Sequence, residues 1–285
     1  MRADAEGQED GHARLPDGGR IAYQIRGRND GGTPVLVLRP LGGSMALWDP
    51  FRALLAEHHR VIAFDHRGSG FSSRAPALTT TQGIARDSLH LLDHLGIAQA
   101  QVFGISLGGM VASWIAILAP QRVTKLCLAA APARGIELTR AGLGRGLSLL
   151  ACLARPLEDV EASLVDRILS RPFRENQPDE VRRIERLVRA ETATRTELMK
   201  LCIAGARHDA RSELHRITAP TLVLAGAHDA LLGTEPPRAL AGAIRGATFG
   251  VIADSGHDLT LEQPIATAAR VAEFFQAPPR SRRRA

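Results

Sequence analysis

The sequence predicts an α/β fold in which a mostly parallel sheet is covered by helices. Two observations carry this prediction. Short apolar runs, each about as long as a buried strand, alternate with segments of helical periodicity from about residue 34 to 130. The alternation returns from Thr221 to about residue 276, after a stretch in which no strand pattern occurs, residues 133–217. Strands that are separated by helices usually lie parallel in one sheet.

The first half of the chain contains most of the predicted strands. Residues 13–27 are expected to form two strands around the turn Asp17-Gly18-Gly19. Helical spacing occurs in residues 47–58, 79–95 and 110–118; a threonine caps the second helix and Pro120 ends the third. The further strands predicted in this half are Pro34–Leu38, Val61–Phe64, Gln101–Phe103 and Val123–Leu128.

The second half begins with a segment of helical pattern alone. Amphipathic spacing occurs at about residues 156–170 and 179–203, so an all-helical cap is expected to interrupt the sheet domain and to cover a site. Strands are then expected at Thr221–Leu224 and 248–252, and helices at 236–244 and 262–276. The predicted organisation is core 1–132, cap 133–217, core 218–277 and basic tail 278–285.

Composition and charge exclude several classes of function. The net charge is +6, but all except two of the 36 basic residues are arginines scattered among acids, and the only dense run is the tail RSRRRA. This pattern favours a solvated surface over a nucleic-acid interface. No apolar stretch is long enough for a membrane helix or a secretory signal. The three widely spaced cysteines fit a reducing cytoplasm, which is the expected location.

A glycine-rich turn supplies the candidate nucleophile. Gly104-Ile105-Ser106-Leu107-Gly108 has the form GxSxG, between a predicted strand and a predicted helix. A serine at such a tight turn points away from the sheet, and its flanking glycines avoid side-chain clashes. The helix that follows favours negative charge at its N-terminus. Ser106 is therefore the candidate nucleophile rather than an incidental turn residue.

A nucleophilic serine needs a base, and the base needs a third group to orient it. Asp229 follows the strand TLVLAG, and His257 follows the strand at 248–252. Both lie where parallel sheets build sites, and the order Ser106, Asp229, His257 is the one expected for such a sheet. Asp254 and Asp258 are weaker candidates for the orienting acid because they share the loop of His257.

The whole set of motifs resembles the α/β-hydrolase fold superfamily, in the branch of serine esterases and 3-oxoadipate enol-lactonase-like proteins. The resemblance implies an eight-stranded, mostly parallel sheet with an inserted helical cap, a Ser-His-Asp triad and no cofactor. Dehalogenases and epoxide hydrolases of this fold carry aspartate where this chain has Ser106. His58-His59 and His208-Asp209 are expected to be surface pairs, so no metal site is predicted. The segments that carry the resemblance are LGGS (41–44), FDHRGSGFSS (64–73), FGISLGGMVAS (103–113), TLVLAGAHD (221–229) and SGHDLTLEQP (255–264).

The same resemblance places an oxyanion hole at the N–H groups of Leu107 and Leu41. Members of the family usually have His-Gly before the second donor, whereas this chain has Arg39-Pro40. Proline has no N–H, but the donor belongs to Leu41 and is retained. The Arg39–Pro40 bond is open to the cis form. Arg39 has two interpretations: a pair with Asp65 at the end of the neighbouring strand, or a binding group for a substrate carboxylate.

The predicted function is hydrolysis of a carboxylic ester or lactone by Ser106, His257 and Asp229 through an acyl-enzyme. The partner is a small-molecule substrate, without nucleic acid or membrane, and the protein is either a monomer or a homo-oligomer. A carbon–carbon bond hydrolase or a thioesterase that uses the same triad is the alternative among enzymes. A ligand-binding receptor of this fold is the alternative outside enzymes. The sequence does not name the substrate.

Overall fold

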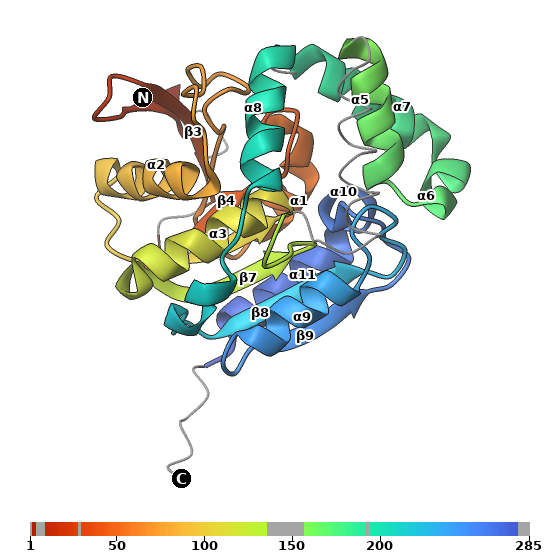
Figure 1. Ribbon diagram of the computed structural model, residues 1–285. Coiled ribbons are helices and arrows are strands. Elements are labelled where there is room, and N and C mark those ends of the chain that lie inside the picture. Colours follow the sequence, from red (N-terminus) through yellow and green to blue (C-terminus); the bar gives the residue numbers. More distant parts are fainter. Residues whose placement is uncertain (1, 4–8, 28–29, 136–156, 192–193, 279–285) are drawn as a thin grey trace.

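The computed structural model describes residues 2–3, 9–27, 30–135, 157–191 and 194–278, and these build one sheet with helices on both faces (Figure 1). The sheet has nine strands in the order β1-β2-β3-β5-β4-β6-β7-β8-β9. The first three strands run antiparallel to their neighbours, and β4 to β9 run parallel to one another. The strands are β1 (Arg2–Ala3), β2 (Glu9–Arg14), β3 (Arg20–Arg26), β4 (Val35–Leu38), β5 (Val61–Phe64), β6 (Ala100–Ile105), β7 (Val123–Ala129), β8 (Thr221–Gly226) and β9 (Thr248–Ile252).

The central parallel strands are mostly apolar because both faces of the sheet are covered. Every residue of β4, β5, β6 and β8 is buried. Successive residues point to opposite faces, so Val102 packs in one core cluster and Phe103 in the other. The mostly parallel sheet predicted from the apolar runs is confirmed.

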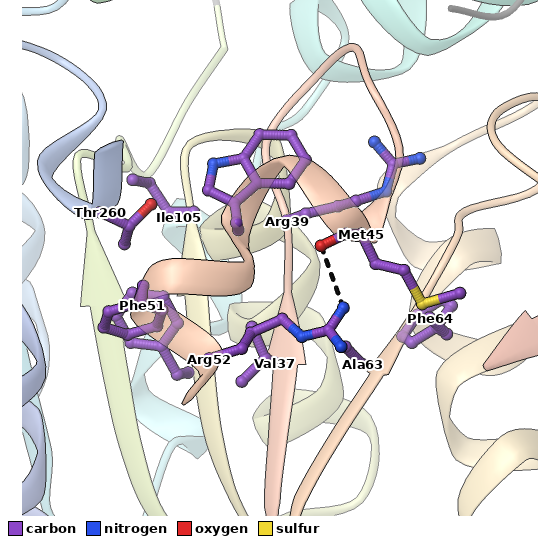
Figure 2. A pocket seen from close by; sticks show the side chains of 11 residues that line it. Val37, Arg39, Met45, Phe51, Arg52, Ala63, Phe64, Ile105 and Thr260 are labelled. Atoms are coloured by element: carbon purple, nitrogen blue, oxygen red, sulfur yellow. Dashed lines mark hydrogen bonds between the residues drawn. The ribbon is translucent and has the colours of Figure 1, made fainter. Parts of the chain in front are cut away.

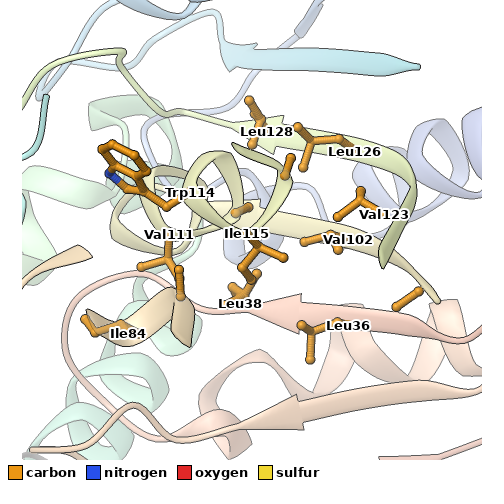
Figure 3. Packing of buried hydrophobic residues seen from close by; sticks show 14 of the residues in the cluster. Leu36, Leu38, Ile84, Val102, Val111, Trp114, Ile115, Val123, Leu126 and Leu128 are labelled. Carbon is orange, nitrogen blue, oxygen red and sulfur yellow. The ribbon is translucent and has the colours of Figure 1, made fainter. Parts of the chain in front are cut away.

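Each face has its own helices. On one face lie α2 (Thr81–His94), α3 (Leu107–Leu118) and α9 (Glu235–Ala243); on the other lie α1 (Asp49–Ala56) and α11 (Pro264–Gln276). Figure 3 shows how α3 turns Val111 and Ile115 toward Leu36, Leu38 and Val102 of the sheet. This packing fixes the N-terminus of α3 against the strand ends.

Helices also follow β7, where the chain leaves the sheet before returning in β8. They are α5 (Leu157–Ile168), α6 (Arg171–Asn176), α7 (Pro178–Glu191), α8 (Arg195–Ala206) and the short η3 (Arg211–Arg216). The two ends of this helical insertion pair in an antiparallel bridge between Arg134 and Asp209, and the Ala210 N–H donates to Ala133 (2.9 Å). Residues 136–156 and 192–193 of the predicted cap lie outside the described residues.

The structure differs from the predicted elements at several boundaries. The sheet has nine strands rather than eight because two residues, Arg2–Ala3, add β1 at its edge. Strand β2 begins at Glu9, before the predicted segment 13–27. The helix predicted at 47–58 is two elements, a 3₁₀ helix η1 (Met45–Trp48) and α1. Within the described ranges, no helix combines the length and apolar character needed to cross a bilayer.

Candidate active site

Ser106 occupies the tight turn between β6 and α3. Its dihedral angles are φ 54° and ψ −118°, a region that costs a non-glycine residue about 1–3 kcal/mol. Two backbone hydrogen bonds hold it there. The Ser106 N–H donates to the Ala129 carbonyl of β7 (2.9 Å), and the Ser106 carbonyl accepts from the Met110 N–H (3.0 Å). The strain therefore resides at the residue predicted to be the nucleophile.

The glycines of the turn are required by close backbone approaches. A Cβ at Gly104 would lie 2.3 Å from the Gly108 carbonyl oxygen, and a Cβ at Gly108 would lie 2.2 Å from the Leu38 carbonyl oxygen. Both distances are shorter than any tolerated contact. The first turn of α3 is thus pressed directly onto the carboxyl end of β4, which leads into the predicted oxyanion turn.

Ser106, His257 and Asp229 are brought together by three separate strand ends. His257 Nε2 lies 2.8 Å from Ser106 Oγ, and His257 Nδ1 lies 2.8 Å from Asp229 Oδ2. The carboxylate only accepts, so Nδ1 carries the proton and Nε2 is left to accept the serine proton. The N–H groups of Leu231 (2.9 Å) and Leu232 (2.8 Å) hold the other oxygen of Asp229.

Burial and mutual attraction oppose each other at His257 and Asp229. Burial alone would lower the pKa of His257, but the adjacent Asp229 carboxylate raises it above the ordinary histidine value. Burial alone would raise the pKa of Asp229, but the charge and hydrogen bond of His257 and the loop amides lower it below the ordinary aspartate value. Asp229 is therefore ionised whenever His257 titrates, and it stabilises the imidazolium.

The predicted oxyanion donors, Leu41 and Leu107, lie at neighbouring points of the fold. Leu107 is the first residue of α3, and amides in the first turn of a helix have no partner within the helix. Leu41 lies in the turn after β4, where Gly42 and Gly43 adopt φ of 87° and 62°. Leu38 is in register with Gly104 of β6, so this turn lies beside the Ser106 turn.

Arg39 is buried and pairs with Asp65, as the first of its two interpretations states. Its Nε lies 3.3 Å from Asp65 Oδ1, with the arginine 3% exposed and the aspartate fully buried. The second interpretation, a binding group for a substrate carboxylate, is not supported because the guanidinium nitrogens face protein groups. All peptide bonds of the described residues are trans, including Arg39–Pro40.

Two further carboxylates lie beside His257: Asp258, a weaker candidate for the orienting acid, and Glu262, whose role was not predicted. Asp258 accepts a hydrogen bond from the Trp48 indole (2.9 Å) and caps the short helix α10 (Leu259–Glu262). Glu262 accepts from the N–H (2.8 Å) and hydroxyl (2.5 Å) of Ser170 and from the Gly256 N–H (3.0 Å). Burial raises the pKa of both carboxyl groups. Both residues fall in the motif SGHDLTLEQP, but two of their partners, Trp48 and Ser170, lie far away in the sequence.

The histidine pairs outside the site have ordinary structural surroundings. His208 is buried against Trp114 and lies 3.0 Å from the Thr81 hydroxyl, and burial lowers its pKa to about 4. It is therefore not the surface residue that the sequence suggested. Burial also lowers the pKa of His59. Among the described residues, no three histidine, cysteine or acidic side chains are grouped to hold a metal ion.

Comparison with known proteins gives one consistent family. Residues 33–264 match the model of the alpha/beta hydrolase fold. The chain is 30% identical over 249 residues to 3-oxoadipate enol-lactonase 2 of Acinetobacter baylyi. The aligned segment covers 86% of this chain and 89% of that protein. A solved hydrolase from Pseudomonas aeruginosa covers 94% of this chain and 99% of its own (30% identity, TM-score 0.83). The enol-lactonase of Burkholderia xenovorans covers 94% of this chain and all of its own (26% identity, TM-score 0.83).

Proposed function

The chain belongs to the α/β-hydrolase fold family, and from this premise we propose that it is a serine hydrolase of carboxylic esters or lactones. One observation carries the proposal: the two 2.8 Å contacts that join Ser106, His257 and Asp229 behind a strained strand-to-helix turn. A half-buried serine beside an oriented imidazole is the arrangement that acyl transfer needs.

The proposed reaction follows from the protonation states. His257 Nε2 takes the proton of Ser106 as Oγ bonds to the substrate carbonyl carbon, and the carbonyl electron pair moves to its oxygen. The N–H groups of Leu41 and Leu107 stabilise that oxyanion. His257 then protonates the departing alkoxide, which leaves an acyl-enzyme. A water molecule deprotonated by the same nitrogen releases the acid.

The helical insertion is proposed to act as a cap over this site. Ile168 at the end of α5 accepts from the Asp258 N–H (3.0 Å), and Ser170 binds Glu262. The end of α8 approaches the other side, because a Cβ at Gly205 would lie 3.5 Å from the Leu107 side chain. Contacts on both sides of Ser106 support a cap that covers the catalytic residues.

The ester or lactone class is proposed with support from the relatives, two of which are named enol-lactonases. A panel of esters, lactones and thioesters, each with and without a free carboxylate, tests the class. Turnover confined to thioesters would contradict it. Labelling by a fluorophosphonate without any turnover would favour the receptor alternative.

The nucleophile is tested by Ser106→Ala, with Ser113→Ala as the matched control. Ser113 is a buried serine of α3 whose hydroxyl donates to the Gly109 carbonyl (3.0 Å). We expect Ser106→Ala to fold, to lose fluorophosphonate labelling and to lower kcat for p-nitrophenyl acetate about 1000-fold or more. Ser113→Ala should keep both the fluorophosphonate labelling and the wild-type kcat. Full activity in Ser106→Ala would refute the assignment.

A further inference from the structure

The guanidinium of Arg39 lies against the backbone of the turn that follows it. Its Nη1 donates to the Gly42 carbonyl (2.8 Å) and contacts the Pro40 carbonyl (3.4 Å), while Nη2 donates to the Ser69 hydroxyl. A single buried side chain thus contacts two carbonyls of a turn with two left-handed glycines.

The direction of one peptide unit decides whether the oxyanion hole exists. In a trans peptide the C=O and N–H point in opposite directions. The Pro40 carbonyl faces Arg39 Nη1, so the Leu41 N–H, which belongs to the same unit, points away from the guanidinium. Rotation of this unit would turn the carbonyl oxygen toward the oxyanion.

From the sheet order we infer toward which strand that N–H is directed. The neighbours of β4 are β5, which leads to Asp65, and β6, which leads to Ser106. Arg39 pairs with Asp65 and therefore lies toward the β5 side of the turn. An N–H that points away from it points toward the β6 side, where Ser106 stands.

Asp65 fixes both the guanidinium and the far end of the turn. Its Oδ1 accepts from the Met45 N–H (2.9 Å), and its Oδ2 accepts from the Phe71 N–H (3.0 Å). The pair is buried, so removal of either partner would leave a costly unpaired charge. The turn between Pro40 and Met45 is thereby held at both ends by one ion pair.

We propose that Arg39 is a positioning residue of the oxyanion hole: it holds the Pro40 and Gly42 carbonyls so that the Leu41 N–H faces the substrate carbonyl oxygen. The inference rests on the proposed serine hydrolase function. It assigns Arg39 no contact with substrate.

The test compares Arg39→Met and Arg39→Lys with the control Arg52→Met. Lysine keeps a positive charge beside Asp65 but lacks the planar fork of donors with which Arg39 reaches Asp65, Ser69 and the two carbonyls together. Arg52 is equally buried, but its donors serve the Met45 carbonyl (3.0 Å, Figure 2) and Gln24 (2.7 Å) rather than the two carbonyls that Arg39 contacts. The readouts are kcat for p-nitrophenyl acetate and inhibition by phenyl trifluoromethyl ketone and by acetophenone. Ser106 Oγ adds to the carbonyl carbon of phenyl trifluoromethyl ketone and gives an anionic hemiketal, whose oxygen occupies the oxyanion hole. Acetophenone binds without forming this anion.

Loss of one oxyanion donor lowers kcat by about 100-fold or more, and we expect Arg39→Lys and Arg39→Met to approach that loss. Affinity for the trifluoromethyl ketone should fall by a similar factor, whereas affinity for acetophenone should not change. Arg52→Met should lower stability but keep the ratio of the two affinities. If Arg39→Met does not fold, the kcat and ketone affinities of Arg39→Lys alone decide whether the proposal holds.

Wild-type kcat and ketone affinities in Arg39→Lys would overturn the proposal. Equal losses for both ketones, matched by Arg52→Met, would also overturn it, because they would indicate general loosening. These outcomes differ from failure of the proposed function itself, in which the wild-type chain would show neither turnover nor fluorophosphonate labelling.

Discussion

Replacement of Glu262 by alanine should lower the free energy of unfolding more than replacement of a surface carboxylate does. Glu262 accepts from the N–H and hydroxyl of Ser170 in the helical insertion and from the N–H of Gly256, the residue before His257. It is 6% exposed. A buried donor left without its acceptor costs about 1–3 kcal/mol. Two backbone amides lose their acceptor in Glu262→Ala, so the free energy of unfolding should fall by about 2–6 kcal/mol.

The assay is urea unfolding together with kcat for p-nitrophenyl acetate. The matched control is Glu273→Ala, which removes an exposed carboxylate paired with Arg270, an interaction worth about 0–1 kcal/mol. Because Gly256 is adjacent to His257, kcat should also fall, by about 10- to 100-fold for a shift of the imidazole. A double-mutant cycle with Ser170→Ala should give a coupling energy of about 1–3 kcal/mol. If Glu262→Ala were no more destabilising than Glu273→Ala, or if the coupling were zero, this reasoning would be wrong.

Two further predictions concern the pH profile and the Ser106 turn. Since Asp229 raises the pKa of His257, kcat/KM should fall on acidification with a midpoint above the ordinary histidine pKa, as protonated His257 cannot accept the Ser106 proton. Asp229→Asn should move that midpoint down and lower kcat by about 10⁴-fold; an unmoved midpoint in a pH–rate profile would contradict the pairing. Gly108→Ala should lower the thermal midpoint and abolish turnover because its Cβ would lie 2.2 Å from the Leu38 carbonyl oxygen. Gly242→Ala in α9, where a Cβ meets nothing within 4 Å, should be neutral or stabilising, and equal effects of the two changes would be inconsistent with the steric argument.

Strands buried on both faces could be predicted closely from the sequence, whereas the edge of the sheet could not. Val61–Phe64 has the bounds that its apolar run indicates, because burial on both faces requires every residue to be apolar. Strand β2, EDGHAR, is mostly polar and alternates in burial. It exists because β3 pairs with all six of its residues, and such pairing is not visible in a local pattern.

The candidate site shows the same division between local and distant information. The positions of Ser106, Asp229 and His257 follow from strand ends that the sequence marks, and the Arg39–Asp65 pair follows from adjacent strands. The role of Glu262 could not be predicted because Ser170 lies 92 residues away in the helical insertion. No periodicity in the insertion specifies which loop of the sheet it contacts.

Buried carboxylates hold the loops that carry the proposed chemistry. Each accepts backbone N–H groups from a loop at the carboxyl edge of the sheet, and burial opposes the charge of at least two of them by raising their pKa. Stability alone does not explain this arrangement, since buried ionic groups are often no more stabilising than apolar residues of similar size. Positioning does explain it, because a charged acceptor fixes amide directions that an apolar side chain would leave free. The carboxylates are Asp65, Asp229, Asp258 and Glu262. On this argument, the accuracy of the site comes from anions that are costly to bury, and apolar substitutions at these positions should lower activity as well as stability.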